Sequence, residues 1–152
     1  MSATLTTTIT DSVTLNGAPR GTTNTLVTTG IVDVFERILT CSHSNTTTIA
    51  TFASTPHADA GETNLDVENT KYLRVTNLSA GEDMKLAFIT TNTNYQVTVR
   101  AGGSHVLFQA EEGAIGETDT TPAFGTLEDI TAIQVRPSGS TDIQVEIFVA
   151  LV

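Results

Sequence analysis

Alternation of apolar and polar residues between positions 71 and 108 constrains the fold of this chain more than any other feature. Large apolar side chains recur at every second position in four short runs: Leu73 and Val75; Met84, Leu86 and Phe88; Tyr95, Val97 and Val99; Val106 and Phe108. A period of two places each run on one face of a strand. Turn-forming glycine and asparagine separate the runs, and closely spaced strands with short connections pair antiparallel. The segment is therefore predicted to be an antiparallel β-meander with one apolar face.

Further strands are predicted on both sides of this segment. Residues 2–15 alternate weakly and are rich in threonine, which suits an edge strand or an extended amino-terminal arm. Asn16-Gly17 predicts a turn, and residues 22–29 form the next short strand. Residues 130–136 and 141–152 are the closing strands.

The number and spacing of these strands indicate the fold class. Eight to ten short strands in 152 residues predict an all-β protein, an antiparallel β-sandwich. Long polar segments at 54–64 and 109–129 favour a jelly roll over a simple meander. By length, residues 1–152 are expected to form a single domain.

Residues 31–40, IVDVFERILT, fit two secondary structures. The apolar positions match the i, i+3, i+4 spacing of a helix. Frequent β-branched residues, and continuation through Cys41 into a second β-rich piece, favour a strand. The strand is preferred, and it is expected to pair with residues 46–53 across a turn at 42–45.

The closing segment 141–152 is apolar on both faces. Ile143, Val145, Ile147, Val149 and Leu151 share one face, and Phe148, Ala150 and Val152 share the other. A strand that is apolar on both faces is normally buried on both. Either a loop of the same chain or a neighbouring subunit must cover the second face. The expected interface between copies comprises Ile147, Phe148, Val149, Ala150, Leu151 and Val152.

Composition argues against several classes of partner. Seven basic against 17 acidic residues give a net charge of −10, which repels phosphate backbones, so no nucleic-acid partner is expected. No run approaches the roughly 18 apolar residues of a membrane span, and the first residues lack the pattern of a secretory signal. The single cysteine, Cys41, excludes an intramolecular disulfide and is expected to be a small buried hydrophobe.

Few residues are suited to catalysis or metal binding. Cys41 and His43 lie two apart, and Asp33 or Glu36 could orient the imidazole, but the simpler interpretation is a core thiol beside a turn histidine. His105 is expected to be a solvated strand residue, and His57 lies in a loop. No zinc spacing occurs, and the acidic loops do not match a calcium-binding loop. No catalytic residue, metal or cofactor is predicted.

Four stretches carry a resemblance to a known group of proteins: TTTITDSVTLNG at 6–17 with Arg20-Gly21 after it, DVFERIL at 33–39, YLRVTNLSAGEDMKLAF at 72–88, and YQVTVRAGGSHVLF at 95–108. The chain resembles the small threonine-rich virion structural proteins of tailed bacteriophages, especially marine and cyanobacterial phages. Such proteins are β-sandwich or jelly-roll modules on the outside of the particle, where they act as decoration or cement proteins. They have no catalytic residues to carry over.

The resemblance implies a non-enzymatic protein made in the bacterial cytoplasm and located on the virion surface. Its partners would be the major capsid protein and other copies of itself, with a homotrimer as the expected form. The expected capsid contacts are Leu5 and Ile9 in the arm and Glu111 and Glu112 in the long acidic loop. The alternative is a tail or head-fibre module that binds a host receptor or glycan, for which Tyr72, Tyr95 and Phe124 are the candidate aromatic contacts.

Overall fold

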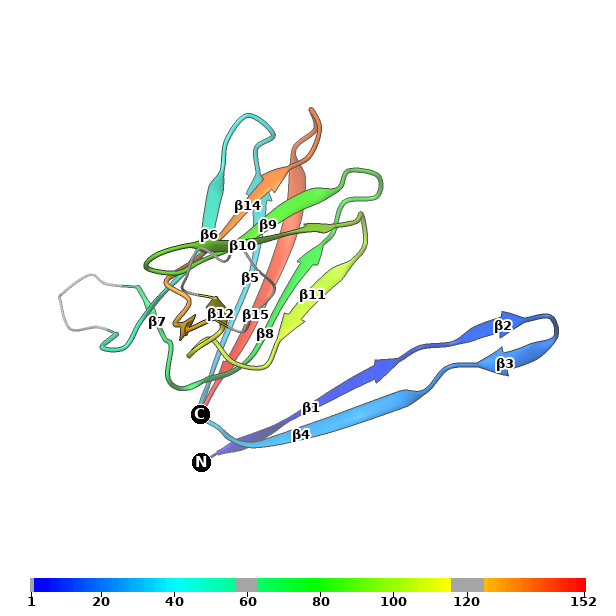
Figure 1. Cartoon of the computed structure of the whole chain (residues 1–152), viewed down its shortest axis with the longest axis horizontal. Coiled ribbons are helices and arrows are strands. Elements are labelled where there is room, and N and C mark those ends of the chain that lie inside the picture. The colour runs from blue at the N-terminus through cyan, green and yellow to red at the C-terminus, as the bar shows by residue number, and fades with distance from the viewer. Residues whose placement is uncertain (1, 57–62, 116–124) are drawn as a thin grey trace.

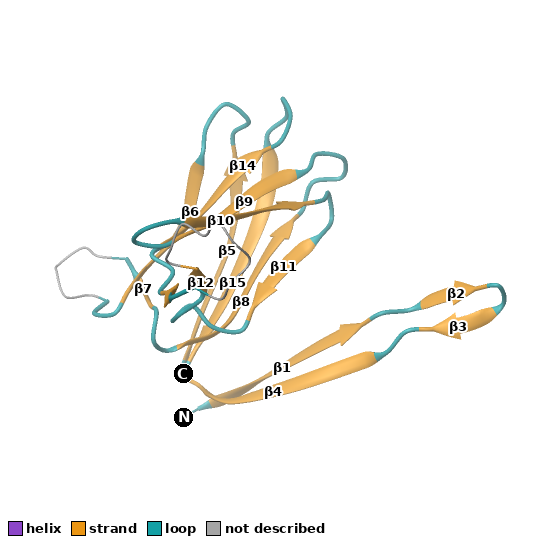
Figure 2. Ribbon diagram, in the orientation of Figure 1, coloured by secondary structure: helices purple, strands orange, loops and turns teal. Residues whose placement is uncertain are grey.

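The computed structural model describes residues 2–56, 63–115 and 125–152, and these residues form strands, turns and loops without any helix (Figures 1 and 2). Two larger sheets make up the body of the molecule, and a long two-stranded ribbon projects from it. This arrangement confirms the prediction of an all-β protein. The strand assigned to residues 31–40 is also confirmed.

One sheet of the body contains five strands. In spatial order they are β10 (Asn94–Val99), β9 (Met84–Ile89), β14 (Ala132–Pro137), β6 (Thr47–Ala53) and β7 (Leu65–Asp66). The other contains four: β11 (Ser104–Leu107), β8 (Thr70–Asn77), β15 (Ile143–Leu151) and β5 (Asp33–Cys41). All neighbours pair antiparallel except β6 and β7, which are parallel. The short strands β12 (Ala114–Ile115) and β13 (Leu127–Glu128) pair only with each other.

The pairing of the eight longer body strands is nested. The first, β5, pairs with the last, β15; β6 pairs with β14, β8 with β11, and β9 with β10. A long hairpin rolled up into two sheets produces this order. The jelly-roll part of the fold prediction stays a prediction.

A hydrophobic core fills the space between the two sheets. Val75, Val145 and Ile147 enter it from the four-stranded sheet, and Leu86 and Phe88 face them from the five-stranded sheet, all fully buried. Cys41 is fully buried among them, as predicted. The apolar positions of the alternating sequence are thus the positions whose side chains enter the core, and the positions between them face away from it.

Two predictions of strand pairing are wrong. The strands of 71–108 do not form one meander, because β9 and β10 lie in one sheet while β8 and β11 pair in the other. Residues 33–41 do not pair with residues 46–53; β5 pairs with β15, and the turn at 42–45 carries the chain from one sheet to the other. Alternation in the sequence identifies which face of a strand is buried. It does not identify the sheet to which the strand belongs, because the strands of both sheets have one apolar inner face.

The amino-terminal ribbon is a single long hairpin. Its base pairs β1 (Ala3–Thr10) with β4 (Thr23–Ile31), and its tip pairs β2 (Val13–Leu15) with β3 (Ala18–Arg20). The register is unchanged from Thr4 opposite Thr29 to Leu15 opposite Ala18. At about 3.3 Å per residue the ribbon is about 36 Å long. The predicted arm at 2–15 is therefore one half of this element.

Glycine and asparagine shape the ribbon at three places. Asn16 and Gly17 both have positive φ (51° and 77°), as the two-residue turn of a twisted hairpin requires. At Gly21 a β-carbon would lie 1.9 Å from the carbonyl oxygen of Asp11, so only glycine fits. Gly30 (φ 83°) is the extra residue opposite the register shift between Ala3 and Thr4, where the chain bends from β4 towards β5.

Candidate assembly surface

The outer face of the four-stranded sheet, which points away from the core, is apolar near the ribbon. The registers place Val34, Ala150 and Tyr72 side by side in one row, and Phe148 in the next. The ring of Tyr72 meets the rings of Phe108 and Phe148 edge-on, each at a centroid distance of 5.9 Å. We call the following residues the outer patch: Val34, Ile38, Tyr72, Val106, Phe108, Phe148 and Ala150.

The base of the ribbon covers the middle of the outer patch. Leu5 of β1 packs with Ile31, Tyr72 and Ala150, and the last two are buried by this contact and by their neighbours. A shallow groove of about 310 Å³ remains between β1 and the sheet, with Arg74 and Phe148 among its lining residues. The chain itself therefore supplies part of the cover that the doubly apolar strand β15 requires.

Both sides of the outer patch stay bare. On the β5 side, Val34 is 46% exposed and Ile38 60% exposed, and Val32 at the end of the ribbon is exposed as well. On the opposite side, Phe108 is 43% exposed. We call Val32, Val34 and Ile38 the β5 strip. The strip adjoins the surface that the ribbon base already covers, and exposed Glu36 lies on the same face between Val34 and Ile38.

One ion pair lies within the outer patch. Arg74 of β8 pairs with Glu146 of β15, and its guanidinium also lies 6.0 Å from the centre of the Phe148 ring. The pair neutralises both charges on a half-buried surface. The middle of the patch therefore presents aromatic and aliphatic groups around a neutralised pair, with exposed Glu36 beside Phe148.

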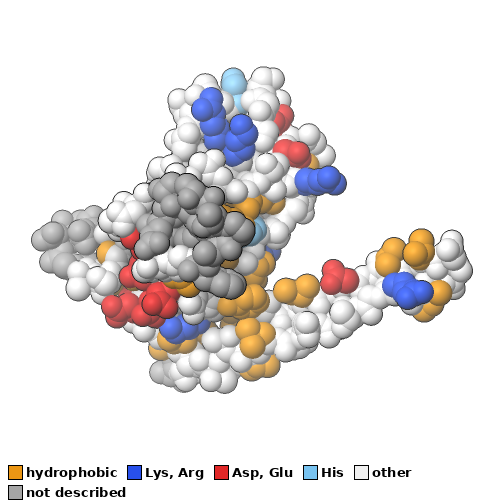
Figure 3. Space-filling view, in the orientation of Figure 1, with side chains coloured by type: hydrophobic (Ala, Val, Ile, Leu, Met, Phe, Trp, Pro, Cys, Tyr) orange, Lys and Arg blue, Asp and Glu red, His pale blue; other side chains and the backbone are white. Residues whose placement is uncertain are grey.

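The ribbon has two different faces. Alternation and the shared register place Leu5, Ile9 and Leu26 on one face. The other face carries a run of threonines together with one large apolar residue, Val27. Threonine hydroxyls on this second face meet across the strands, as in Thr8 with Thr25 at 3.4 Å. Of the three apolar residues on the first face, Leu5 is the one that belongs to an apolar cluster with the body. Ile9 and Leu26 are nearly half exposed, and Val13 and Leu15 at the tip are more than half exposed. Figure 3 shows apolar side chains at the outer end of the ribbon.

The ribbon is electrically neutral, whereas the body is strongly acidic. Residues 2–31 contain one acidic residue, Asp11, and one basic residue, Arg20, so the net charge of −10 resides entirely in residues 32–152. The ribbon is thus a large surface that can approach another acidic molecule without charge repulsion.

The structure places the predicted interface residues of β15 in three environments. Ile147, Val149 and Leu151 face the core, and Ala150 lies under the ribbon base. Phe148 and Val152 keep part of their surface exposed. An interface between copies at this strand stays a prediction, and only Phe148 and Val152 offer surface to it.

The predicted capsid contacts lie on separate parts of the molecule. Leu5 is half-buried at the ribbon base and Ile9 is exposed further out. Glu111 and Glu112 are exposed in the turn before β12, where the Glu112 amide donates a hydrogen bond to Asp129 Oδ1 at 2.9 Å. Neither glutamate belongs to the outer patch or its groove. Much of the acidic loop, 116–124, lies outside the described residues, as do Phe124 and His57.

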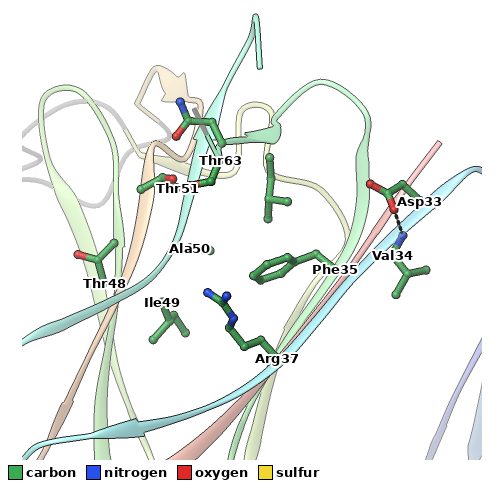
Figure 4. Close-up of a pocket in the computed structure, with 11 residues that line it drawn as sticks. Asp33, Val34, Phe35, Arg37, Thr48, Ile49, Ala50, Thr51 and Thr63 are labelled. Carbon is green, nitrogen blue, oxygen red and sulfur yellow. Dashed lines mark hydrogen bonds between the residues drawn. The ribbon is translucent and has the colours of Figure 1, made fainter. Parts of the chain in front are cut away.

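A second hollow lies at the open side of the sandwich, between strands β5 and β6 (Figure 4). It has a volume of about 520 Å³, and its lining includes Phe35, Arg37, Ile49 and Leu65. The Arg37 guanidinium lies 5.8 Å from the centre of the Phe35 ring. The slot combines an aromatic ring, a cation and threonine hydroxyls, and it was not apparent from the sequence because β5 and β6 were expected to pair.

His43 lies in the turn between β5 and β6 and is paired with a carboxylate. His43 Nδ1 lies 2.7 Å from Asp142 Oδ1, and this carboxylate also accepts a hydrogen bond from the His43 amide. These two hydrogen bonds lower the pKa of Asp142. Asp33 and Glu36 do not orient this ring, contrary to the alternative considered from the sequence, because its partner comes from the far end of the chain. The pair joins the β5–β6 turn to the start of β15.

His105 differs from its prediction as a solvated strand residue. It lies opposite Val75, so it points inwards, and its ring lies 5.4 Å from that of Phe88 and 6.0 Å from that of Tyr95. Burial lowers the pKa of His105. Its Nε2 atom is buried and has no hydrogen-bond partner among the described residues.

Of the aromatic residues proposed for a glycan site, Tyr72 is buried and Tyr95 is partly exposed beside His105. Within the described ranges, no group of three or more His, Cys, Asp and Glu side chains is placed to hold a metal ion. The same part of the chain contains no helix long and apolar enough to cross a membrane.

These features define an all-β, two-sheet protein with a projecting, partly apolar ribbon and an apolar outer face. No protein-family model matches the chain, and a search of curated proteins found no significant match.

Proposed function

We propose that this chain is a non-enzymatic virion structural protein that binds the outside of a phage capsid as a decoration or cement protein. Its partners are the major capsid protein and further copies of the chain, with a trimer as the expected form. The observation that carries the proposal is the ribbon, about 36 Å long, whose apolar side chains beyond Leu5 stay exposed.

Physical reasoning favours a binding role for the ribbon. An isolated two-stranded hairpin is marginally stable in water, and exposed apolar residues on it add no stability unless another surface covers them. Contiguous apolar surface on a soluble protein typically marks a site of interaction. A ribbon can reach across a junction between shell subunits, and many copies acting together would stabilise the shell through avidity.

Purified particles from the source test this proposal. Quantitative mass spectrometry should find hundreds of copies of the chain per particle if it decorates the capsid lattice. A dozen or fewer would indicate a vertex or tail location, and absence from particles would overturn the virion assignment.

The contact element is tested separately, with shells that lack the protein. The full chain should bind these shells, and a variant with the ribbon tip, residues 11–22, replaced by a short turn should bind at least about tenfold more weakly. Equal binding by the two proteins would overturn the role of the tip. A matched variant, Glu111→Gln with Glu112→Gln, tests the acidic loop without altering the ribbon.

The slot between β5 and β6 favours the alternative, a tail or head-fibre module that binds a host receptor or glycan. An aromatic ring, a guanidinium and several hydroxyls are groups that recognise sugars. Glycan-array binding that is lost in Phe35→Ala and kept in Ile9→Asp would support this function. An absence of binding across the array would leave the capsid role as the one to pursue.

A further inference from the structure

We propose that the ribbon of one copy lays its apolar face, Ile9 and Leu26, on the β5 strip of a second copy. The inference deepens the proposed function by specifying the contact between copies. It rests on that function only for its biological setting, because the contact itself is a property of the purified chain.

The first argument is that the protein already makes this type of contact internally. Leu5, on the same ribbon face as Ile9 and Leu26, packs on Tyr72 and Ala150 of the outer patch. Ala150 lies directly beside Val34 of the β5 strip. The bare strip therefore adjoins a surface on which this ribbon face already packs through Leu5.

The second argument is that both surfaces are left without cover in a single copy. Ile9 and Leu26 are 46% and 47% exposed, while Val34 and Ile38 of the strip are 46% and 60% exposed. The ribbon leads away from the body beyond its base (Figure 1), so it does not cover the strip of its own chain. One contact with a neighbour would bury exposed apolar groups on both sides.

The third argument is electrostatic. Two copies of the acidic body repel each other, because all of the net charge of −10 lies in residues 32–152. The ribbon carries no net charge. Contact through the ribbon keeps the two bodies apart while it buries apolar surface, which makes it the favoured route for self-association.

The two surfaces in this contact differ, and two closed arrangements satisfy it. Two copies that exchange ribbons form a symmetric, isologous dimer, whereas three copies form a ring of heterologous contacts in which each ribbon reaches the next body. Either closed form leaves no ribbon unused. The trimer expected from the resemblance is one of these forms.

Sedimentation equilibrium of the purified full chain tests the proposal with four variants at exposed positions. Ile9→Asp on the apolar face and Ile38→Asp on the strip should each weaken association at least about tenfold. The matched controls add the same charge nearby: Thr8→Asp on the opposite ribbon face, and Thr40→Asp further along β5. They should change association by less than about threefold.

A crosslink between copies identifies the contact directly. One preparation carries Ile9→Cys and a second, distinguishable by mass, carries Ile38→Cys; Cys41 is buried and can remain. Mild oxidation of the mixture should form a disulfide between the two different chains. A monomeric wild-type chain at all concentrations, or an oligomer that none of the Asp variants weakens, would overturn the proposal. Self-association without shell binding would refute the capsid function and leave this contact standing.

Discussion

His105 has the least satisfied polar group among the described side chains. Its ring lies near the edge strands β10 and β11 of the two sheets, against Phe88 and Tyr95. A neutral imidazole suits this position, since stacking on rings requires no charge. A protonated imidazole there would leave a charge poorly solvated, which is the physical reason for its lowered pKa.

Stability should therefore decrease on acidification across the range in which His105 titrates. With a pKa in the folded state below the unfolded value near 6.5, the unfolded chain binds more protons in this range. The stability that the neutral His105 ring contributes is complete above pH 6.5 and is lost as the pH falls through the folded-state pKa of His105. Denaturant unfolding at pH 8 and pH 5 measures it. His105→Gln should flatten the dependence, whereas the exposed His43→Gln should retain it.

Cys41 should be inert in the folded protein. It is fully buried, and burial raises the pKa of its thiol, so very little reactive thiolate is available near neutral pH. Modification by a small thiol reagent at pH 8 should be slower than for an exposed cysteine such as Ile9→Cys by at least about a hundredfold. Denaturant should abolish the difference. Rapid modification of the native wild-type chain would contradict the burial of Cys41.

Among the elements, the ribbon depends most on single residues. Gly21 sits where the ladder is interrupted between tip and base, and its lack of a β-carbon allows the close approach of the Asp11 backbone. In contrast, a β-carbon added at Gly81 would extend into open space. These two glycines provide a matched pair for testing whether ribbon and body are stabilised independently.

Gly21→Ala should loosen the ribbon and leave the body intact. The forced shift of the backbone should cost about 1 to 3 kcal/mol locally. Hydrogen exchange should then accelerate at amides of β2 and β3, while exchange in β9 and β15 stays unchanged. Gly81→Ala should affect neither region. Loss of protection throughout the body in Gly21→Ala would mean that the ribbon is part of the cooperative core.

The sequence predicts where the strands lie better than it predicts which strands pair with each other. Asn16-Gly17 and the alternation around it locate the hairpin turn, but residues 22–29 carry few apolar side chains, so their pairing with β1 is not evident. The Ser42–Asn45 turn is short enough for a hairpin, yet Cys41 and Ile49 are both core residues on different sheets. The doubly apolar closing strand indicated the Phe148 and Ala150 part of the outer patch. The Tyr72 part was missed because Tyr72 and Leu73 are both buried, and alternation assigns only one of them to a buried face.

At the level of the whole molecule, the nested topology separates two roles. Pairing of β5 with β15 closes the body around its core, and the chain that precedes β5 is left free to form the ribbon. The net charge follows this division, with a neutral ribbon attached to an acidic body. In the proposed assembly, the acidic body would provide solubility and the neutral ribbon would provide association.

The salt dependence of self-association distinguishes this arrangement from an interface held by charge pairs. The Debye length falls from about 10 Å at 0.1 M salt to about 3 Å at 1 M, so repulsion between acidic bodies weakens as salt is added. An apolar ribbon contact loses nothing by this screening. Association measured by sedimentation equilibrium should therefore tighten several-fold between about 0.05 M and about 0.5 M sodium chloride. Thr8→Asp should follow the same trend, because its added charge lies away from the contact. Weaker association at the higher salt concentration would show that ion pairs hold the copies together, and the neutral ribbon would then not be the bridging element.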